Sequence, residues 1–381
     1  MISFNQNAVS LLCILVGFVY SQTNLDDVCT VKSTSLQGVC KFIKDCPRAQ
    51  EELQQHHLPQ ICGFHRFDPI ICCPSVATRK PGEISKKKCE EYSAYVNETY
   101  IPPIGLIDAE PVTSYECGHT VETLIVGGTE AQQKEFPHMV SQETDNQKAC
   151  AAIGYGSSVK DAGWFCGGTL LSDEYVLTAA HCLSNQDWGD AKWVKLGVTR
   201  LTSTHRKRQH IEIAELIPHP KYKSASHYYD IGLLKLKKLA KLNSFSRPAC
   251  LYSKEEITAE KAIATGWGQT EFSGTSSNDL LKVTLELTDR NTCTRLYEHA
   301  GRRLKNGILS ESQICAGSQL GNDTCQGDSG GPLQIYHIHD DIKCMYDIIG
   351  VVSFGKGCSG SPGVYTRISY YIKWIEDIVW P

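Results

Sequence analysis

Three short stretches decide how this chain of 381 residues is interpreted. Residues 327–332 read GDSGGP, which places Ser329 in a tight turn rich in glycine. Residues 178–182 read TAAHC and place His181 beside a cysteine. Residues 230–234 read DIGLL and place Asp230 at the start of an apolar strand. Each feature alone is usually structural, as a core histidine, a strand-end cap or a simple turn. The signal lies in their combination.

The three side chains fit one chemistry. A serine hydroxyl is a poor nucleophile until a neighbouring base takes its proton, and a histidine that titrates near neutrality is a suitable base. An acid must hold the imidazole in the right tautomer and stabilise its charged form. We therefore predict that Ser329 is a nucleophile, His181 its base and Asp230 the acid. The glycines let the chain turn sharply, so that the N–H groups of Gly327 and Ser329 could form an oxyanion hole.

Outward from these motifs, the chain between residues 125 and 381 consists mostly of short apolar runs separated by turns. Many short strands indicate a β-barrel or a β-sandwich. Apolar residues at positions 372, 375, 378 and 379 have helical spacing, which predicts a closing amphipathic helix. The runs lie at residues 169–180, 211–217, 231–236, 281–287 and 348–354.

Composition and the N-terminus set the cellular context. Hydrophobic residues make up 41% of the chain, which allows a sizeable core, and the net charge of −4 gives no reason to expect nucleic acid. The apolar run at residues 8–20 predicts a secretory signal peptide over residues 1–21. A membrane anchor is the alternative, but the run is short for a spanning helix. We expect a secreted, extracellular protein that does not bind a membrane.

Cysteine usage agrees with export. The chain has 18 cysteines, and Cys13 lies in the predicted signal, so an odd number remains and at least one lacks an intramolecular partner. Six cysteines fall within residues 29–73, a segment too short to fold on its core alone, so three disulfides are expected there. Metal binding is less favoured because the segment has no CxxC pair.

Residues 74–124 are predicted to be a linker. The stretch contains Lys86-Lys87-Lys88 and two adjacent prolines, and such polar segments stay extended and accessible to proteases. Asn97 begins an Asn-Glu-Thr sequon and is the predicted glycosylation site.

The three motifs resemble those of the trypsin/chymotrypsin family, and IVGG at residues 125–128 resembles its activation site. The six-cysteine segment, residues 29–73, resembles a clip domain, so the whole chain resembles an arthropod clip-domain serine protease. CEEY at residues 89–92 and FPHM at residues 136–139 resemble the snake-type members. The resemblance implies an all-β protease domain over residues 125–381. It would have two antiparallel six-stranded β-barrels with the active site between them, and a C-terminal helix.

The resemblance also assigns activation and specificity residues. Cleavage between Leu124 and Ile125 would free an ammonium group that pairs with Asp328, since a buried carboxylate needs a partner. Asp323 would form the floor of the primary pocket and select Arg or Lys, with Gly355 and Gly363 leaving the walls open. Residues 353–355 would pair with the substrate backbone as an added strand.

Disulfide pairs follow from the same resemblance. Cys117–Cys250 would tie the light chain to the catalytic chain. The remaining cysteines leave Cys150 as the odd one and Cys89–Cys344 as a possible pair. The other implied pairs are Cys29–Cys72, Cys40–Cys62, Cys46–Cys73, Cys166–Cys182, Cys293–Cys315 and Cys325–Cys358.

No metal or cofactor is expected. Val198 and Arg208 stand where calcium-binding relatives carry glutamate, and Pro362 stands where sodium-regulated relatives carry tyrosine. The resemblance implies three protein partners: another clip-protease zymogen as substrate, an upstream activating protease and a serpin inhibitor. The sequence leaves open whether the cascade is immune or developmental.

Two other functions were weighed. A catalytically dead clip-domain homologue would act as a binding module, but such relatives lose the serine that is present here as Ser329. A digestive trypsin would need neither the clip-like segment nor the long linker.

Overall fold

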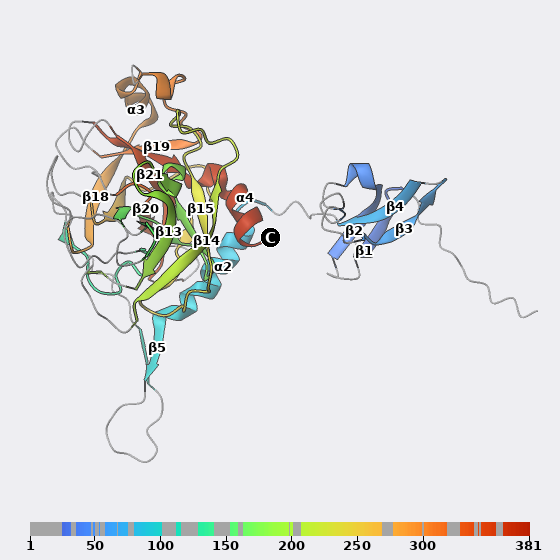
Figure 1. Ribbon diagram of the computed structural model, residues 1–381, viewed down its shortest axis with the longest axis horizontal. Coiled ribbons are helices and arrows are strands. Elements are labelled where there is room, and N and C mark those ends of the chain that lie inside the picture. The colour runs from blue at the N-terminus through green and yellow to red at the C-terminus, as the bar shows by residue number, and fades with distance from the viewer. Residues whose placement is uncertain are drawn as a thin grey trace, which may run out of the picture. The chain divides into compact units, whose positions relative to one another are not determined.

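The computed structural model describes two compact units, residues 1–79 and 80–381 (Figure 1). The structure describes the residues whose placement is defined. These are residues 25–31, 36–46, 49, 53, 58–66, 68–74, 80–100, 112–115, 129–140, 153–158, 163–197, 199–200, 207–268, 277–298, 301–317, 328–338, 342, 344–355 and 361–381.

The first unit is a four-stranded antiparallel sheet. Its strands are β1 (Val28–Val31), β2 (Leu36–Phe42), β3 (Ile61–His65) and β4 (Asp68–Pro74), in the order β1-β2-β4-β3. A 3₁₀ turn, η1 (Ile43–Asp45), follows β2.

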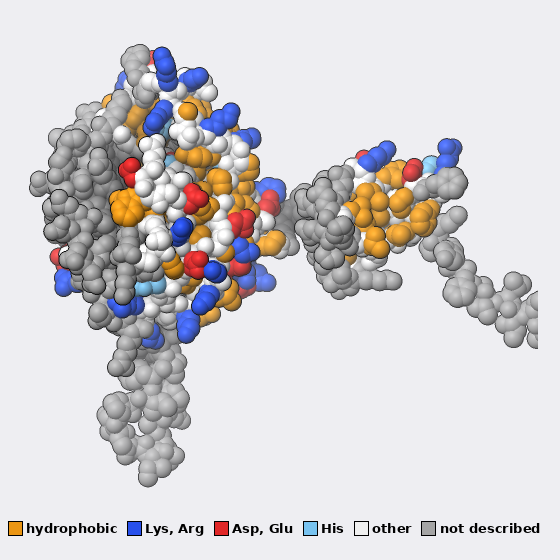
Figure 2. All heavy atoms as spheres, viewed as in Figure 1, with side chains coloured by type: hydrophobic (Ala, Val, Ile, Leu, Met, Phe, Trp, Pro, Cys, Tyr) orange, Lys and Arg blue, Asp and Glu red, His pale blue; other side chains and the backbone are white. Residues whose placement is uncertain are grey.

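Three disulfides hold this first unit together. They are Cys29–Cys72, Cys40–Cys62 and Cys46–Cys73, the pairs that the resemblance implies. The buried core around Ile71 is small, so cross-links supply stability that packing alone cannot. Figure 2 shows hydrophobic side chains gathered on the outer surface of this unit, and Val28, Ile61 and Phe64 are all more than half exposed.

The second unit contains two antiparallel barrel-like sheets, as expected. Each has eight strands in the described residues, and six in each remain when strands of only two residues are set aside. The longer strands of the first sheet are β8 (Ile153–Tyr155), β9 (Gly163–Cys166), β11 (Tyr175–Thr178), β13 (Gly189–Leu196), β14 (Gln209–Pro218) and β15 (Gly232–Leu236). Those of the second are β17 (Lys261–Gly266), β18 (Leu281–Thr288), β19 (Gln313–Ala316), β20 (Pro332–Tyr336), β21 (Tyr346–Phe354) and β22 (Gly363–Arg367).

The two-residue strands extend the sheets at their margins. β10 (Thr169–Leu170) and β12 (Ser184–Asn185) belong to the first sheet, and β7 (Thr129–Glu130) and β16 (Cys250–Leu251) belong to the second. β16 is the exception to the antiparallel pattern, because it runs parallel to β21.

One buried cluster joins the two sheets. It contains Leu177 and Leu233 from the first sheet and Ile348 and Val351 from the second. The C-terminal helix α4 (Ile368–Val379) packs on the same cluster through residues that include Ile372, Ile375 and Val379, so the predicted amphipathic helix is present. A shorter helix, α3 (Arg290–Leu296), is capped by the Asp289 side chain. None of the helices in the described part of the chain is both long and apolar enough to cross a bilayer.

The predicted linker differs from expectation, because part of it is a docked helix. Helix α2 (Glu83–Ser93) is followed by the 3₁₀ turn η2 (Ala94–Val96) and by the paired strands β5 (Asn97–Tyr100) and β6 (Val112–Tyr115). The Glu376 carboxylate of α4, only 5% exposed, accepts hydrogen bonds from the backbone N–H groups of Gly82 at 3.1 Å and Ser85 at 2.9 Å. These donors would otherwise lack a partner at the start of α2, so the C-terminal helix α4 stabilises α2.

Docking of α2 also corrects two disulfide predictions. Cys89 lies on the buried face of α2 and is bonded to Cys250, with 4.9 Å between their Cα atoms. The predicted Cys117–Cys250 and Cys89–Cys344 pairs are therefore wrong, because docking of α2 brings Cys89 against Cys250. Cys344 is also disulfide-bonded, and every other cysteine in the described ranges has a different partner. The partner of Cys344 thus lies outside the described residues, as do Cys117, Cys150, Cys325 and Cys358.

Candidate active site

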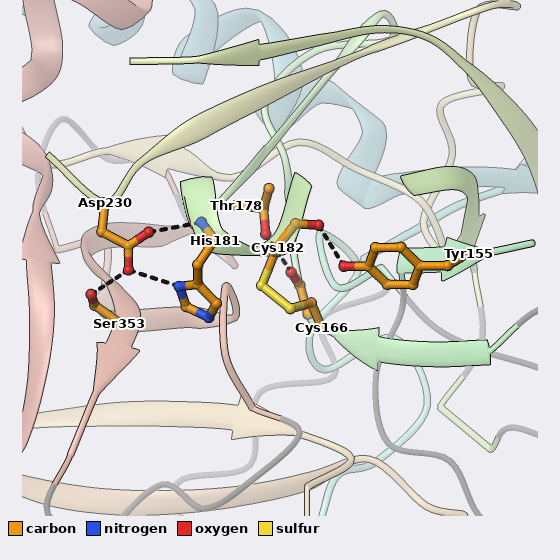
Figure 3. The surroundings of a disulfide bond; sticks show 8 residues. Tyr155, Cys166, Thr178, His181, Cys182, Asp230 and Ser353 are labelled. Atoms are coloured by element: carbon orange, nitrogen blue, oxygen red, sulfur yellow. Dashed lines mark hydrogen bonds and ion pairs between the residues drawn. A yellow bond between two sulfur atoms is a disulfide. The ribbon is translucent and has the colours of Figure 1, made fainter. Parts of the chain in front are cut away.

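His181 and Asp230 come together across 49 residues of sequence. His181 lies in the 3₁₀ turn η3 (Ala180–Leu183) that follows β11, and Asp230 lies just before β15, the neighbour of β11. The Asp230 Oδ2 atom is 2.8 Å from His181 Nδ1, and the His181 backbone N–H donates to Oδ1 at 3.0 Å (Figure 3). The side chain of Asp230 is 4% exposed and that of His181 is 35% exposed. One face of the imidazole therefore remains open to a reactant.

Two hydroxyl groups from the second sheet support Asp230. The Ser353 hydroxyl of β21 donates to Asp230 Oδ2 (Figure 3). The Thr366 hydroxyl of β22 donates to the Asp230 backbone oxygen at 2.7 Å. From the sequence, Ser353 was expected only to pair with substrate, and Thr366 had no expected role. Their contact with Asp230 spans more than 120 residues and has no local signal in the sequence.

The electrostatics of the pair suit a catalytic base. Burial would lower the pKa of His181, but the charge of Asp230 and the hydrogen bond between them raise it above the ordinary value of 6.5. Burial would raise the pKa of Asp230, but the charge of His181 and the hydrogen bonds from His181 and Ser353 hold it below its usual value. Asp230 therefore stays ionised and stabilises the imidazolium form of His181.

The turn that contains Ser329 packs closely against the elements that carry His181. The Ser329 backbone oxygen accepts from Gly167 N–H at 2.7 Å, and Gly167 follows Cys166, which is bonded to Cys182. A Cβ atom added at Gly330 would lie 2.2 Å from Thr178 Oγ1, so only glycine allows this approach. Gly330 also has a positive φ of 77°.

A shell of hydrogen bonds holds the loop around His181. The Thr178 hydroxyl donates to the Gly167 oxygen at 2.8 Å, and the Tyr155 hydroxyl donates to the Cys182 oxygen (Figure 3). Burial raises the pKa of Tyr155 well above its usual value, so the hydroxyl keeps its proton. Together with the Cys166–Cys182 disulfide, these bonds fix the backbone on both sides of His181.

Asp328 sits in a pocket made by two glycines. The Gly268 N–H donates to Asp328 Oδ1 at 2.8 Å. A Cβ atom at Gly266 would lie 1.9 Å from Asp328 Oδ1, and one at Gly268 would lie 2.5 Å from each carboxylate oxygen. The carboxylate can occupy this position only because both residues lack side chains.

Several predicted site residues fall outside the described residues. These are Leu124, Ile125, Asp323, Gly327 and Val198. Among those inside, Gly363 begins β22 and is buried, whereas Gly355 directly follows β21 and is exposed. The Pro362 oxygen accepts a hydrogen bond from the Tyr297 hydroxyl at 2.7 Å.

One aromatic contact next to this region was missed by the sequence analysis. His227 stacks on Phe354, with 4.1 Å between ring centroids, and burial lowers the pKa of His227. His227 lies three residues before Asp230, and Phe354 follows Ser353, so the stack lies beside the His181–Asp230 pair. Its short spacing from Asp230 in the sequence was the available signal.

Metal binding finds no support in the described cysteines. The histidine and cysteine groups close enough to share an ion include the Cys89–Cys250 and Cys166–Cys182 pairs. A sulfur in a disulfide is not a thiolate and cannot serve as a strong metal ligand.

Known proteins are similar to the chain over the catalytic region and over nearly its whole length. The family model described as Trypsin matches residues 125–375. Serine protease snk from Drosophila melanogaster is 39% identical over 350 residues, which cover 90% of this chain and 76% of the relative. Phenoloxidase-activating enzyme 1 from Spodoptera litura and proclotting enzyme from Tachypleus tridentatus are each 30% identical, over 97% of this chain and 98% of the relative. We conclude that the chain belongs to the trypsin family, among the arthropod clip-domain serine proteases, and is a trypsin-like serine endopeptidase.

Proposed function

We propose that this protein is a secreted zymogen. It is activated by cleavage between Leu124 and Ile125, and then cleaves a downstream protease zymogen after Arg or Lys in an extracellular cascade. The observation that carries the proposal is the His181–Asp230 pair, with 2.8 Å between Nδ1 and Oδ2 and a further donor on the same carboxylate from Ser353.

The reaction follows from the roles of these groups. His181 takes the proton of the Ser329 hydroxyl as the hydroxyl attacks the scissile carbonyl, and later returns a proton to the leaving amine. Asp230 keeps a proton on Nδ1 and stabilises the imidazolium. The N–H groups of Gly327 and Ser329 bind the oxyanion, where each donor contributes about 3–4 kcal/mol.

Specificity rests on the predicted pocket. A carboxylate at Asp323 would pair with the cation of a substrate Arg or Lys, which otherwise would be buried without a partner. Gly363 is buried at the start of β22 and Gly355 follows β21, positions that support their role as open pocket walls. Residues 353–355 would bind the substrate backbone as an added strand.

Activation rests on Asp328. The new ammonium group of Ile125 would pair with this carboxylate and order the oxyanion hole. The space that Gly266 and Gly268 leave around Asp328 supports the assignment.

The extracellular setting has separate support. Seven or more disulfide bonds would not persist in a reducing cytosol, since six pairs are formed by described cysteines and Cys344 is bonded as well. The names of two relatives, a phenoloxidase-activating enzyme and a proclotting enzyme, support a protein substrate and a place in a proteolytic cascade. We further propose a clip-protease zymogen as substrate, an upstream activating protease, a serpin inhibitor, and glycosylation at Asn97.

The test is to activate the purified protein and label it with a fluorophosphonate probe. Labelling of the wild type and none of Ser329→Ala would support the enzyme, and no labelling of either would favour a binding module. Incubation of the active enzyme with candidate clip-protease zymogens, followed by sequencing of the new N-termini, would then identify the cleaved bond. New N-termini that do not follow Arg or Lys would contradict the pocket assignment.

A further inference from the structure

A small cavity lies beside the disulfide that joins α2 to the second sheet. Its volume is about 250 Å³, and both Cys89 and Cys250 contribute to its wall. This bond connects the segment upstream of the proposed activation site with β16 of the protease unit. The remaining lining residues are Lys86, Leu251, Tyr252, Ser253, Lys254, His337 and Asp347.

A histidine and a carboxylate stand next to this disulfide. His337 Nδ1 is 2.8 Å from Asp347 Oδ1, and their side chains are 9% and 7% exposed. A ring nitrogen of His337 lies within 4.8 Å of the sulfur atoms of both cysteines. Because Asp347 engages Nδ1, it fixes the orientation of the ring beside the sulfur atoms.

We propose that Cys89–Cys250 is a thiol-exchange site for a small anionic thiol. The thiolate of the incoming molecule attacks one sulfur of the disulfide, so a new mixed disulfide forms and the Cys89–Cys250 bond breaks. The electron pair of the broken bond stays on the second cysteine, which leaves as a thiolate and takes a proton from His337. A second thiolate can then attack the mixed disulfide, which releases the small molecule as its own disulfide and leaves both cysteines reduced.

The cavity restricts the size and charge of the reagent. A volume of about 250 Å³ holds a molecule such as cysteine or glutathione but excludes a protein domain. Lys86 and Lys254 on its wall would attract the carboxylate of such a thiol. Neutral and cationic thiols lack this attraction.

The other disulfides of the protease unit offer useful contrasts. Cys293 and Cys315 are as buried as Cys89 and Cys250, at 2% to 3% exposure, but no histidine joins Cys293 and Cys315 in a cluster of potential ligands within the described ranges. Cys166–Cys182 does have a histidine nearby, but that residue is His181, which already serves the active site. Cys89–Cys250 is therefore the described disulfide that combines a histidine outside the active site with a cavity.

The test uses the full-length zymogen and four thiols. The protein is incubated with glutathione, cysteine, mercaptoethanol or cysteamine at equal thiolate concentrations, then trapped with an alkylating agent and mapped by mass spectrometry. We expect Cys89 and Cys250 to be labelled about a hundredfold faster than Cys293 and Cys315, and faster with the two carboxylate-bearing thiols than with the others. With glutathione as the thiol, equal labelling rates for the cysteines of Cys89–Cys250 and of Cys293–Cys315 would overturn the proposal.

Variants at His337 and Lys86 separate the contribution of proton donation from that of charge attraction. His337→Gln should slow exchange at Cys89–Cys250 about a hundredfold with every thiol. Lys86→Gln should weaken the preference for anionic thiols, since only Lys254 then remains, and should not slow exchange with neutral thiols. The exposed Lys87→Gln on the same helix, outside the cavity wall, is the matched control. Unchanged cleavage of an Arg-containing peptide after activation would show that each variant is folded. An unchanged exchange rate in folded His337→Gln would overturn the role of the histidine.

Discussion

Ser353 donates its hydroxyl hydrogen bond to Asp230 although 123 residues separate them in sequence. The acceptor is Oδ2, the same oxygen that faces the Nδ1 atom of His181. The charge of the catalytic carboxylate is thus shared between its histidine and a donor from the second sheet.

Removal of this donor should change the pH dependence of activity. In Ser353→Ala the carboxylate loses a stabilising hydrogen bond, so the pKa of Asp230 rises and its charge acts more strongly on His181. The acid limb of kcat/KM should move to higher pH, and kcat should fall about tenfold with little change in KM. Thr366→Val, which removes only a bond to the Asp230 backbone oxygen, is the control and should leave the limb in place. An identical pH profile for Ser353→Ala and wild type would refute this role.

The wild-type pH profile is itself predictable. The base must be neutral to accept a proton, and the pKa of His181 is raised above its ordinary value of 6.5, mainly by the charge of Asp230 acting against the opposing effect of burial. Activity should therefore be fully present at pH values above the His181 pKa and be lost as pH falls through it. A titration of kcat/KM should place the midpoint of the acid limb above 6.5. A midpoint below that value would mean that burial outweighs the carboxylate.

The local sequence predicted candidate catalytic groups but not the residues that support them. TAAHC and GDSGGP are short motifs, so their residues can be singled out from a few adjacent positions in the sequence. Ser353 and Thr366 reach Asp230 only after two sheets have packed together, and no local pattern reports that contact. The strand pattern likewise predicted many short strands, whereas the two-barrel arrangement came from resemblance.

Helix α2 shows a second reason why prediction from the sequence was incomplete. Its buried residues Ser85, Cys89 and Tyr92 have helical spacing, which was a usable signal within the predicted linker. The charged composition and Gly82 at the N-cap concealed it, because the cap comes from Glu376, 294 residues away. The Cys89–Cys250 pair depends on this docking and could not be read from cysteine spacing alone.

The cap on α2 can be tested by stability. Glu376→Ala would leave the buried N–H groups of Gly82 and Ser85 without an acceptor, at a cost of about 1–3 kcal/mol in the free energy of unfolding. Thermal unfolding of the zymogen should show a lower Tm. Asp377→Asn on the same helix removes only an exposed ion pair with Lys373 and should change stability by less than about 0.5 kcal/mol. If both variants unfold alike, Glu376 does not hold the helix.

The glycine pocket around Asp328 should be intolerant of any side chain. In Gly266→Ala the new Cβ atom would clash with Asp328 Oδ1, so the carboxylate must move away from Gly268. We expect peptide hydrolysis by the activated enzyme to fall at least about a hundredfold, the scale associated with loss of an oxyanion donor. Gly189→Ala, where nothing lies within 4 Å of the added Cβ atom although φ at Gly189 is 77°, controls for the addition of a methyl group at a glycine and should keep its activity. Normal activity in Gly266→Ala would show that Asp328 does not need this position.

The residue before the proposed activation bond is Leu124. An aliphatic residue at this position restricts which protease can activate the zymogen. A pocket with Asp323 at its floor would have to bury its carboxylate against an aliphatic side chain, which leaves the charge without a partner. The activated enzyme should therefore cleave its own zymogen poorly, and ordinary trypsin should do the same. The activator should have an apolar primary pocket, or should recognise residues 120–123 more strongly than Leu124.

Substitution of Leu124 tests directly whether this residue restricts which protease activates the zymogen. Leu124→Arg should be activated by trypsin with Ile125 as the new N-terminus, whereas the wild type stays largely inactive under the same conditions. Cleavage after Lys86, Lys87 or Lys88 is the competing event, but it would leave Ile125 internal and would not supply the amine that Asp328 requires. N-terminal sequencing separates the two bonds, and hydrolysis of an Arg-containing peptide reports activation. Equal activation of wild type and Leu124→Arg by trypsin, with Ile125 exposed in both, would show that Leu124 does not restrict the activator.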